Sequence, residues 1–164
     1  MSCITFTRRA SIAIVAGFLA GCASVAPPSP ASSAARAAEA ALAAEQRWLG
    51  QLFAGTPVRI ELQRDGQLTV AVPLDFSFDS GRSTVKPPLA KVLDYVAQSA
   101  RRQSTVRVHV AAPTDARGAP ALALRRAGAV RAYLGGKGVA AQRFAELAAT
   151  DGDSVRLRLE PAPQ

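Results

Sequence analysis

The chain has 164 residues and is basic: 20 Lys and Arg stand against 12 Asp and Glu, a formal net charge of +8 at pH 7. The basic residues are spread among acidic ones and are not interleaved with aromatic residues, which argues against nucleic-acid binding. One His and two Cys leave little material for a metal cluster or a catalytic triad. An enzyme is therefore the least favoured class, and no metal, catalytic residue or cofactor is expected.

The N-terminus has the layout of an export signal. Arg8 and Arg9 precede the apolar run Ala10–Ala20, as in a secretory signal peptide. This run is only about half the ~20 residues that a membrane span needs. We therefore expect residues 1–21 to be a signal peptide rather than an uncleaved anchor, which remains an alternative.

The end of this apolar run, Leu19-Ala20-Gly21-Cys22, resembles a bacterial lipobox. The resemblance implies that Cys22 becomes the lipidated N-terminus, carrying diacylglycerol and fatty acyl chains such as palmitate. Ala23 and Ser24 follow without an Asp, which favours the outer membrane over the inner one. Because Cys3 would leave with the signal peptide, no thiol would remain for a disulfide. The alternative is an ordinary signal peptide with an incidental Cys.

Two segments follow the predicted lipid anchor. Residues 22–33 are rich in Pro, Ser and Ala and predict an extended tether. Residues 34–56 are dominated by Ala with Glu and Arg, which predicts a helix that closes at Gly55. Its larger apolar residues gather near its C-terminal end, so we expect its last turns to pack on the following domain. A helix that pairs with a partner protein is the alternative.

Period-two alternation begins at Val58. Val58, Ile60 and Leu62 alternate with polar residues, and the alternation resumes after Asp65-Gly66, a strong hairpin signal. The second arm is expected to continue from residue 68 through Leu74, Phe76 and Phe78, with Pro73 at a bulge or edge.

The remaining elements alternate between helix and strand. Period-3.6 spacing predicts a helix that starts near Pro87 and Pro88, with Ser83 or Thr84 as its cap. A strand with one apolar face follows at residues 106–110, then a helix from about Pro120 to Gly135-Gly136, where the glycines can adopt a left-handed cap. Residues 155–160 predict a last strand. Residues 57–164 therefore form one α+β domain.

A carboxylate and two guanidinium groups come together after the third predicted strand. Asp115 lies in the loop, and Arg125 and Arg126 lie on the helix that follows. A carboxylate can hold an ammonium group, and an Arg fork can hold a carboxylate, so such a pair suits a zwitterion. The alternatives are that Asp115 only accepts backbone hydrogen bonds in a turn, that Arg126 is solvated, or that Arg125 takes its role.

Three motifs in order resemble the OmpA-like peptidoglycan-binding domain: Phe78-Asp79-Ser80-Gly81, Thr114-Asp115-x-x-Gly118, and the run from Arg125-Arg126-Ala127 to Gly138-Val139. The last run is especially similar to peptidoglycan-associated lipoproteins. The resemblance implies a β-α-β-α-β domain after a hairpin strand, with one mixed sheet and helices on one face. It also implies that Asp115 and Arg126, with Thr114 beside them, bind the diaminopimelate of the peptidoglycan stem.

The chain departs from this family pattern between Asp115 and Arg126. The segment is shorter than usual by about one helical turn, ~3.6 residues, so Arg126 can keep its facing. The Asn that family members carry between these positions is missing. A domain that keeps the fold but has lost peptidoglycan binding is therefore an alternative.

The sequence thus predicts an outer-membrane lipoprotein, its domain facing the periplasm, that binds peptidoglycan noncovalently and tethers the membrane to the wall. The alternative is an envelope module that binds another protein through the polar strand face or the Ala-rich helix. That face carries Arg107, His109, Arg156 and Arg158. We expect His109 to be a surface residue without an adjacent carboxylate.

Overall fold

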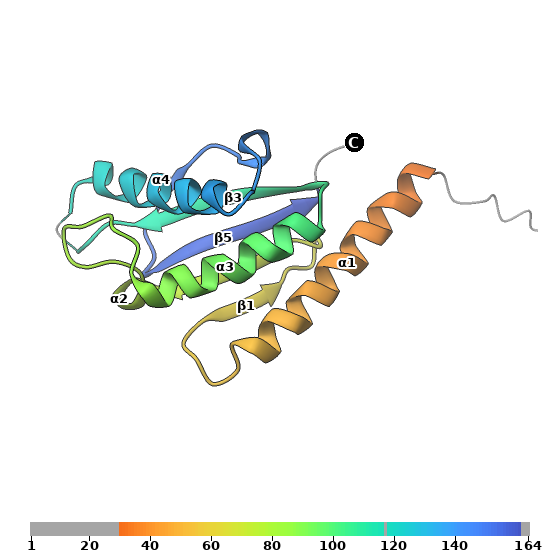
Figure 1. Cartoon of the computed structure of the whole chain (residues 1–164), viewed down its shortest axis with the longest axis horizontal. Helices are drawn as coiled ribbons and strands as arrows, with labels where there is room; N and C mark the ends of the chain where they lie inside the picture. The colour runs from red at the N-terminus through yellow and green to blue at the C-terminus, as the bar shows by residue number, and fades with distance from the viewer. Residues whose placement is uncertain (1–29, 117, 162–164) are drawn as a thin grey trace, which may run out of the picture.

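The computed structural model describes residues 30–116 and 118–161 (Figure 1). The predicted signal peptide, Cys22 and most of the predicted tether lie outside the described residues. The elements are α1 (Pro30–Leu52), β1 (Arg59–Leu62), β2 (Leu68–Pro73), α2 (Leu74–Ser77), α3 (Pro87–Arg102), β3 (Val106–Pro113), α4 (Pro120–Gly136), the 3₁₀ helix η1 (Ala141–Arg143), β4 (Ala148–Thr150) and β5 (Ser154–Pro161).

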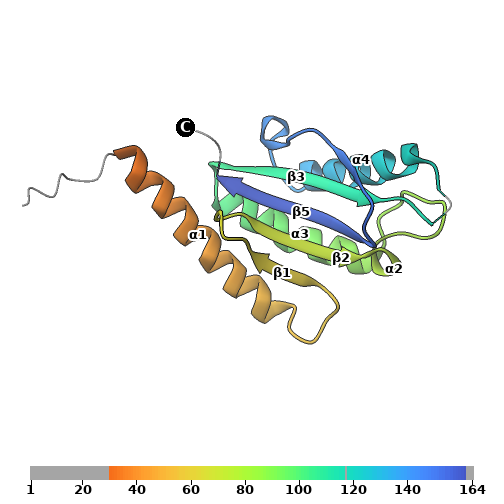
Figure 2. The ribbon, with the colours of Figure 1, turned by 180° about the vertical axis from the view of Figure 1, so that it is seen from behind.

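The described strands form one mixed sheet in the order β1-β2-β5-β3-β4. β3 and β4 are parallel, and the other neighbours are antiparallel. The helices cover one face, as Figure 1 shows, and Figure 2 shows the opposite face with no helix over it. The predicted α+β fold with a mixed sheet and helices on one side is confirmed.

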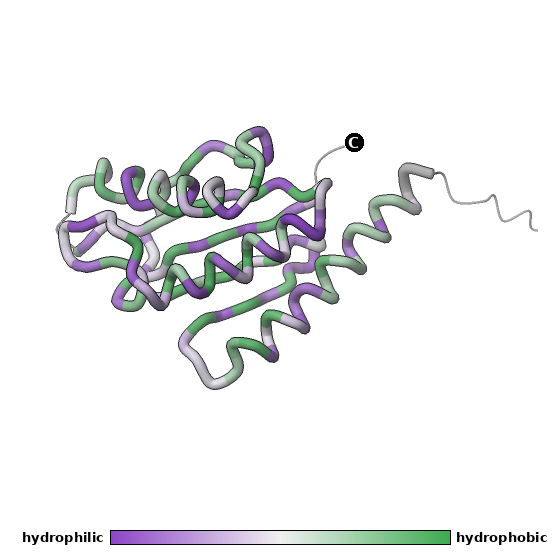
Figure 3. Tube along the Cα trace, viewed as in Figure 1, coloured by the Kyte–Doolittle hydropathy of each residue, from purple (hydrophilic) through white to green (hydrophobic). Residues whose placement is uncertain are grey.

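The hydrophobic core lies between the sheet and the helices. Alternate residues of β2, β3 and β5 are buried because successive side chains of a strand point to opposite faces. Figure 3 shows this alternation as changes between hydrophobic and hydrophilic colours along the strands. α3 adds a stripe of buried apolar residues at helical spacing, from Leu89 to Ala100. These patterns explain why the main strands and helices could be predicted.

Helix α1 packs on the domain through both apolar and charged contacts. Leu42 and Leu49 are fully buried, and Trp48 meets the ring of Tyr95 edge to face at 5.7 Å between centroids. Glu45, only 6% exposed, accepts hydrogen bonds from Arg102 at 2.6 and 2.9 Å and from Ser99 at 2.7 Å. The predicted packing of this helix on the domain is thus present, although α1 begins at Pro30, inside the stretch predicted as tether.

The segment after β2 differs from its predicted form. β2 ends at Pro73, and Leu74–Ser77 forms the short helix α2 instead of a continued strand. The fixed φ of Pro73 suits the residue before a helix, and the Ser77 hydroxyl donates to the Pro73 carbonyl at 2.8 Å. The apolar alternation at Leu74, Phe76 and Phe78 is therefore not a strand signal, and Phe76 is 45% exposed.

The helix ends also correct the predictions in detail. Lys86, not Ser83 or Thr84, is the N-cap residue of α3, and it makes no side-chain cap bond. α4 ends at Gly136 as expected, but the left-handed residue is Gly138, with φ +88°. Its N–H donates to the Gly135 carbonyl and that of Val139 to Leu134, the arrangement of a Schellman motif.

Candidate functional site

A tight turn before α3 forms one wall of the site. The Arg82 N–H donates to the Asp79 carbonyl at 3.0 Å, which closes a four-residue turn. Gly81 is its third residue and has φ +70°, a conformation that a type II turn requires and that glycine adopts without steric cost. The turn directs the Gly81 N–H toward the end of β3.

The loop after β3 forms the opposite wall. The Gly118 N–H donates to the Asp115 carbonyl at 2.8 Å, and the Thr114 hydroxyl donates to the Ala119 carbonyl at 3.2 Å. A Cβ on Gly118 would lie 2.3 Å from the Thr114 Oγ1. The glycine of the Thr114-Asp115-x-x-Gly118 motif is therefore needed because the loop folds back on itself here.

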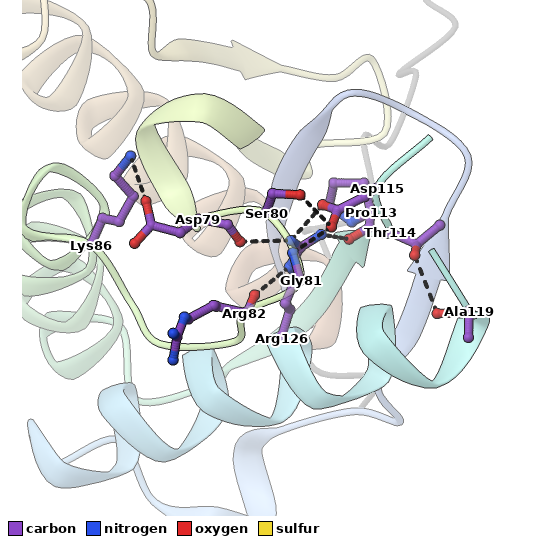
Figure 4. A network of polar contacts seen from close by, with 10 residues as sticks. All are labelled: Asp79, Ser80, Gly81, Arg82, Lys86, Pro113, Thr114, Asp115, Ala119 and Arg126. Carbon is purple, nitrogen blue, oxygen red and sulfur yellow. Dashed lines mark hydrogen bonds and ion pairs between the residues drawn. The ribbon is translucent and has the colours of Figure 1, made fainter. Parts of the chain in front are cut away.

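Arg126 joins the two walls from helix α4 (Figure 4). Its side chain is 0% exposed. It donates from Nε to the Arg82 carbonyl at 2.9 Å, from Nη1 to the Pro113 carbonyl at 3.0 Å, and from Nη2 to the Asp79 carbonyl at 3.2 Å. The Arg126 guanidinium thus links the turn at residues 79–82 to the end of β3.

The fourth partner of Arg126 is the carboxylate of Asp115. Nη2 lies 2.6 Å from Oδ1, while the Gly81 N–H donates to Oδ2 at 2.6 Å and the Ser80 hydroxyl at 3.4 Å. The Gly81 N–H and then Arg126 hold the pKa of the Asp115 carboxyl below its ordinary value. Asp115 is 23% exposed. It is therefore an ionised, oriented carboxylate that solvent and ligands can reach.

The structure brings the predicted Asp115 and Arg126 together, as a direct ion pair rather than as two groups held apart. Thr114 lies beside them, but its hydroxyl is bonded to Ala119. Arg126 is not a solvated helix residue, whereas Arg125 is exposed. Sequence reasoning missed the roles of the Gly81 N–H and of the carbonyls that bind Arg126. The Ser80-Gly81 pair after Asp79 was a usable turn signal, whereas no pattern marks a carbonyl as an acceptor.

An open hollow of about 470 Å³ lies next to Asp115 on the same turn. It is lined by Ser80, Gly81, Arg82, Ser83 and Thr84. Because Ser80 and Gly81 also bind the Asp115 carboxylate, the hollow and the carboxylate share a wall. A ligand seated there would meet the hydroxyl groups and backbone of the turn, with the Asp115 carboxylate bound to the neighbouring Ser80 and Gly81.

His109 has a carboxylate partner, contrary to expectation. Its Nε2 contacts Oε1 of Glu160 on β5, and Arg158 lies 3.5 Å from its Nδ1. His109 pairs directly with Arg158 in the strand register, so Glu160 is its diagonal neighbour on β5. Long side chains can span the distance between diagonal neighbours. Within residues 30–116 and 118–161, no three His, Cys, Asp or Glu side chains are grouped closely enough to hold a metal ion.

The segment of the chain that matches a known family contains the site. Residues 77–157 match the model of the OmpA family. Residues 77–157 are therefore an OmpA-like domain. Members of this family are binding modules rather than enzymes. No curated protein matches the sequence.

Three solved structures share the OmpA-like fold of this chain. A MotB-like protein from Desulfovibrio vulgaris has 18% identity and a TM-score of 0.64, with 80% of this chain and 98% of that chain covered. The cell wall anchor of the type VI secretion system from Pseudomonas aeruginosa has 20% identity and a TM-score of 0.59, with 71% and 96% covered. The periplasmic domain of Helicobacter pylori MotB has 14% identity and a TM-score of 0.56, with 64% and 85% covered.

No helix in the described part of the chain has the length and apolar character that crossing a membrane requires.

Proposed function

We propose that the OmpA-like domain binds peptidoglycan noncovalently, at the zwitterionic end of diaminopimelate in the peptide stem. The observation that carries the proposal is the Asp115 carboxylate, which is ionised, oriented by Gly81 and Arg126, and reachable beside an open hollow. The match of residues 77–157 to the OmpA family supports it, as does the likeness to a structure described as a cell wall anchor.

The ammonium group of the ligand would bind Asp115. A carboxylate offers about four lone-pair sites, and three hydrogen bonds to Asp115 are formed within the chain. An ammonium donor can take the remaining site or replace the long bond from Ser80. The ionised state of Asp115 makes this contact a charge-assisted hydrogen bond.

The carboxylate of the ligand would bind Arg126. A guanidinium has five N–H donors, and Arg126 makes four hydrogen bonds within the chain. Because the Arg126 side chain has no exposed surface, the ligand carboxylate would reach it by displacing the Asp115 oxygen. Thr114, whose hydroxyl is bonded to Ala119, is proposed to add a contact from the loop.

The proposed location is the outer membrane, with the chain anchored through lipid on Cys22 and its domain in the periplasm. More than one acyl chain is needed for stable anchoring. A weak wall contact then suffices, because the tether confines the domain near the wall and raises its effective concentration there. The chain would in this way connect the outer membrane to peptidoglycan.

The burial and hydrogen bonds of Arg126 favour a second candidate function. Because Arg126 is fully buried and bonded to three carbonyls, it already has a complete structural role without any ligand. A domain that kept this contact for stability alone would be an envelope module that binds another protein. Peptidoglycan binding distinguishes the two functions.

Sedimentation of the full-length protein with isolated peptidoglycan tests the proposal. We expect wild type to sediment and Asp115→Asn to bind at least about tenfold more weakly, since a charge-assisted hydrogen bond is lost. The matched control is Asp75→Asn, an exposed carboxylate on α2, which should sediment like wild type. Circular dichroism of each variant verifies folding. Wild type that stays in the supernatant, or Asp115→Asn that sediments equally well, would favour the interaction module.

A separate variant tests the anchor. Cys22→Ala should move the protein from the membrane fraction to the soluble periplasmic fraction, while its binding to isolated peptidoglycan stays unchanged. Retention of Cys22→Ala in the membrane fraction would contradict lipid anchoring without affecting the proposed wall contact.

A further inference from the structure

Figure 2 shows the face of the sheet that lies away from the helices. Exposed arginines of β1 and β5 lie on this face: Arg59, Arg156 and Arg158. In the strand register, Arg59 of β1 pairs with Ala71 of β2, and Ala71 pairs with Arg156 of β5. Arg156 in turn pairs with Ala111 of β3. Two arginines therefore stand on either side of an alanine in one row across the sheet.

The spacing of the sheet places these guanidinium groups within reach of one ligand. Arg59 and Arg156 are two strands apart, roughly 9.6 Å between backbones. Arg158 lies two residues beyond Arg156 on the same face of β5, roughly 6.8 Å along the strand. Both distances are shorter than two extended arginine side chains together. The guanidinium of Arg156 lies beside Gly152 and that of Arg158 beside His109, so a ligand over Ala71 would draw Arg59 and Arg156 toward it.

Arg59 and Arg156 are available for an external anion, whereas Arg158 contacts Nδ1 of His109 at 3.5 Å. All three are exposed, and none takes part in the ion pairs found between described residues. The Asp153 carboxylate is a group within the chain that competes with an external anion for Arg59 and Arg156. Its pKa is lowered first by the Ser154 hydroxyl and its own backbone amide, and also by the charges of Arg59 and Arg156.

The same face is hollowed to a volume of about 470 Å³, within the range of small-molecule sites. Its floor consists of small side chains that leave room for a ring: Ala71, Ala111, Ala148 and Ala149. Thr69 and Thr150 add hydroxyl groups, and Glu61 and Glu146 add carboxylates. The hollow thus offers donors for an anion, acceptors for hydroxyl groups and a flat apolar floor.

We propose that this hollow binds a phosphorylated sugar. Guanidinium forks match phosphate oxygens with paired hydrogen bonds, which assigns the phosphate to Arg59 and Arg156. The sugar ring lies on Ala71 and Ala111, and its hydroxyl groups donate to Glu61 and Glu146. None of these residues contacts Asp115 or Arg126, so this site is separate from the proposed peptidoglycan site.

Isothermal titration calorimetry of the full-length protein in mild detergent tests this site, with glucose 1-phosphate as the probe. We expect saturable binding of glucose 1-phosphate, weaker binding of inorganic phosphate and no binding of glucose. Arg156→Ala should weaken binding roughly tenfold or more, because charge-assisted bonds are lost. Arg156→Lys should recover only part of it, since Lys lacks the fork. The matched control, Arg131→Ala on the exposed face of α4, should bind like wild type.

Three outcomes would overturn the proposal. The first is no binding of glucose 1-phosphate, and the second is equal binding by wild type and Arg156→Ala. The third is binding of a lipid headgroup in place of a soluble sugar phosphate. If the protein floats with phosphatidylglycerol vesicles in an Arg156-dependent way but does not bind glucose 1-phosphate, the hollow serves a membrane surface instead.

Discussion

Two guanidinium groups hold the two ends of β3: that of Arg126 is fully buried and that of Arg143 is half-buried. Arg143 donates to the carbonyls of Ala100, Gln103 and Val106 at 2.6 to 2.8 Å, near the first residue of the strand. Arg126 donates to three carbonyls at the other end, and also to the carboxylate of Asp115. The two arginines differ in that Arg126 also binds a carboxylate, whereas the hydrogen bonds of Arg143 all go to carbonyls.

The Asp115 carboxylate distinguishes the candidate binding site at Arg126 from the structural contact at Arg143. Burial lowers the pKa of Arg143, and no carboxylate offsets this effect. Arg126 has the same structural contacts but also orients a charged group that remains 23% exposed. An arginine that donates to backbone carbonyls therefore holds each end of β3, but only the end with Asp115 offers an ionised group to a ligand.

The largest expected effect is on the Arg126 end. Arg126→Ala should lower the free energy of unfolding by about 3 kcal/mol, because three carbonyls lose this donor and the Asp115 carboxylate loses its ion pair. Urea unfolding measures this change. Arg125→Ala, its exposed neighbour, should stay within about 0.5 kcal/mol of wild type. Equal effects of the two variants would mean that the Arg126 contacts do not stabilise the fold.

A smaller loss is expected at the Arg143 end. Arg143→Ala should lower the free energy of unfolding by about 2 kcal/mol, because carbonyls lose their donor but no charged group is left behind. Its sedimentation with peptidoglycan should be unchanged once folding is verified. A loss greater than that of Arg126→Ala would contradict the distinction between the two ends.

The smallest effect should appear in the pH dependence of stability. Because the pKa of Asp115 is lower in the folded chain, its stabilisation is fully present above the unfolded pKa of about 3.9. It is lost as the pH falls through the lower folded pKa. Wild type should therefore exceed Asp115→Asn in stability at pH 7, and the difference should shrink below about pH 4. Urea unfolding of both proteins across this range measures it, and a constant difference would contradict the ion pair.

Periodic burial explains which parts of the fold were predictable. β3, β5 and α3 each bury one face, so their apolar residues repeat at the period of the element. α4 has apolar residues on its exposed face as well, such as Leu124, and was predicted from Pro120 at its start and the glycines at its end. β4 has the sequence Ala-Ala-Thr at the sheet edge, with no apolar alternation to reveal it. α2 is a single turn of helix, too short for a period to appear.

The site was predictable in its residues but not in its geometry. The motif resemblance pointed to Asp115 and Arg126, which the structure places 2.6 Å apart. The complete burial of Arg126 could not be foreseen, because arginine is mostly exposed and becomes buried only where acceptors from several elements converge. Buried Glu45 has the same explanation, since its partners Ser99 and Arg102 lie more than fifty residues away.

The position of α1 has a mechanical consequence. Its 23 residues span roughly 35 Å. Figures 1 and 2 place α1 beside β1, away from the end of β3 that carries Asp115. A load applied at Pro30 therefore enters the domain through the contacts of Glu39, Leu42 and Glu45. Tension would load the contacts of α1 with the domain before the loops around Asp115, so the contacts that yield first would lie outside the site.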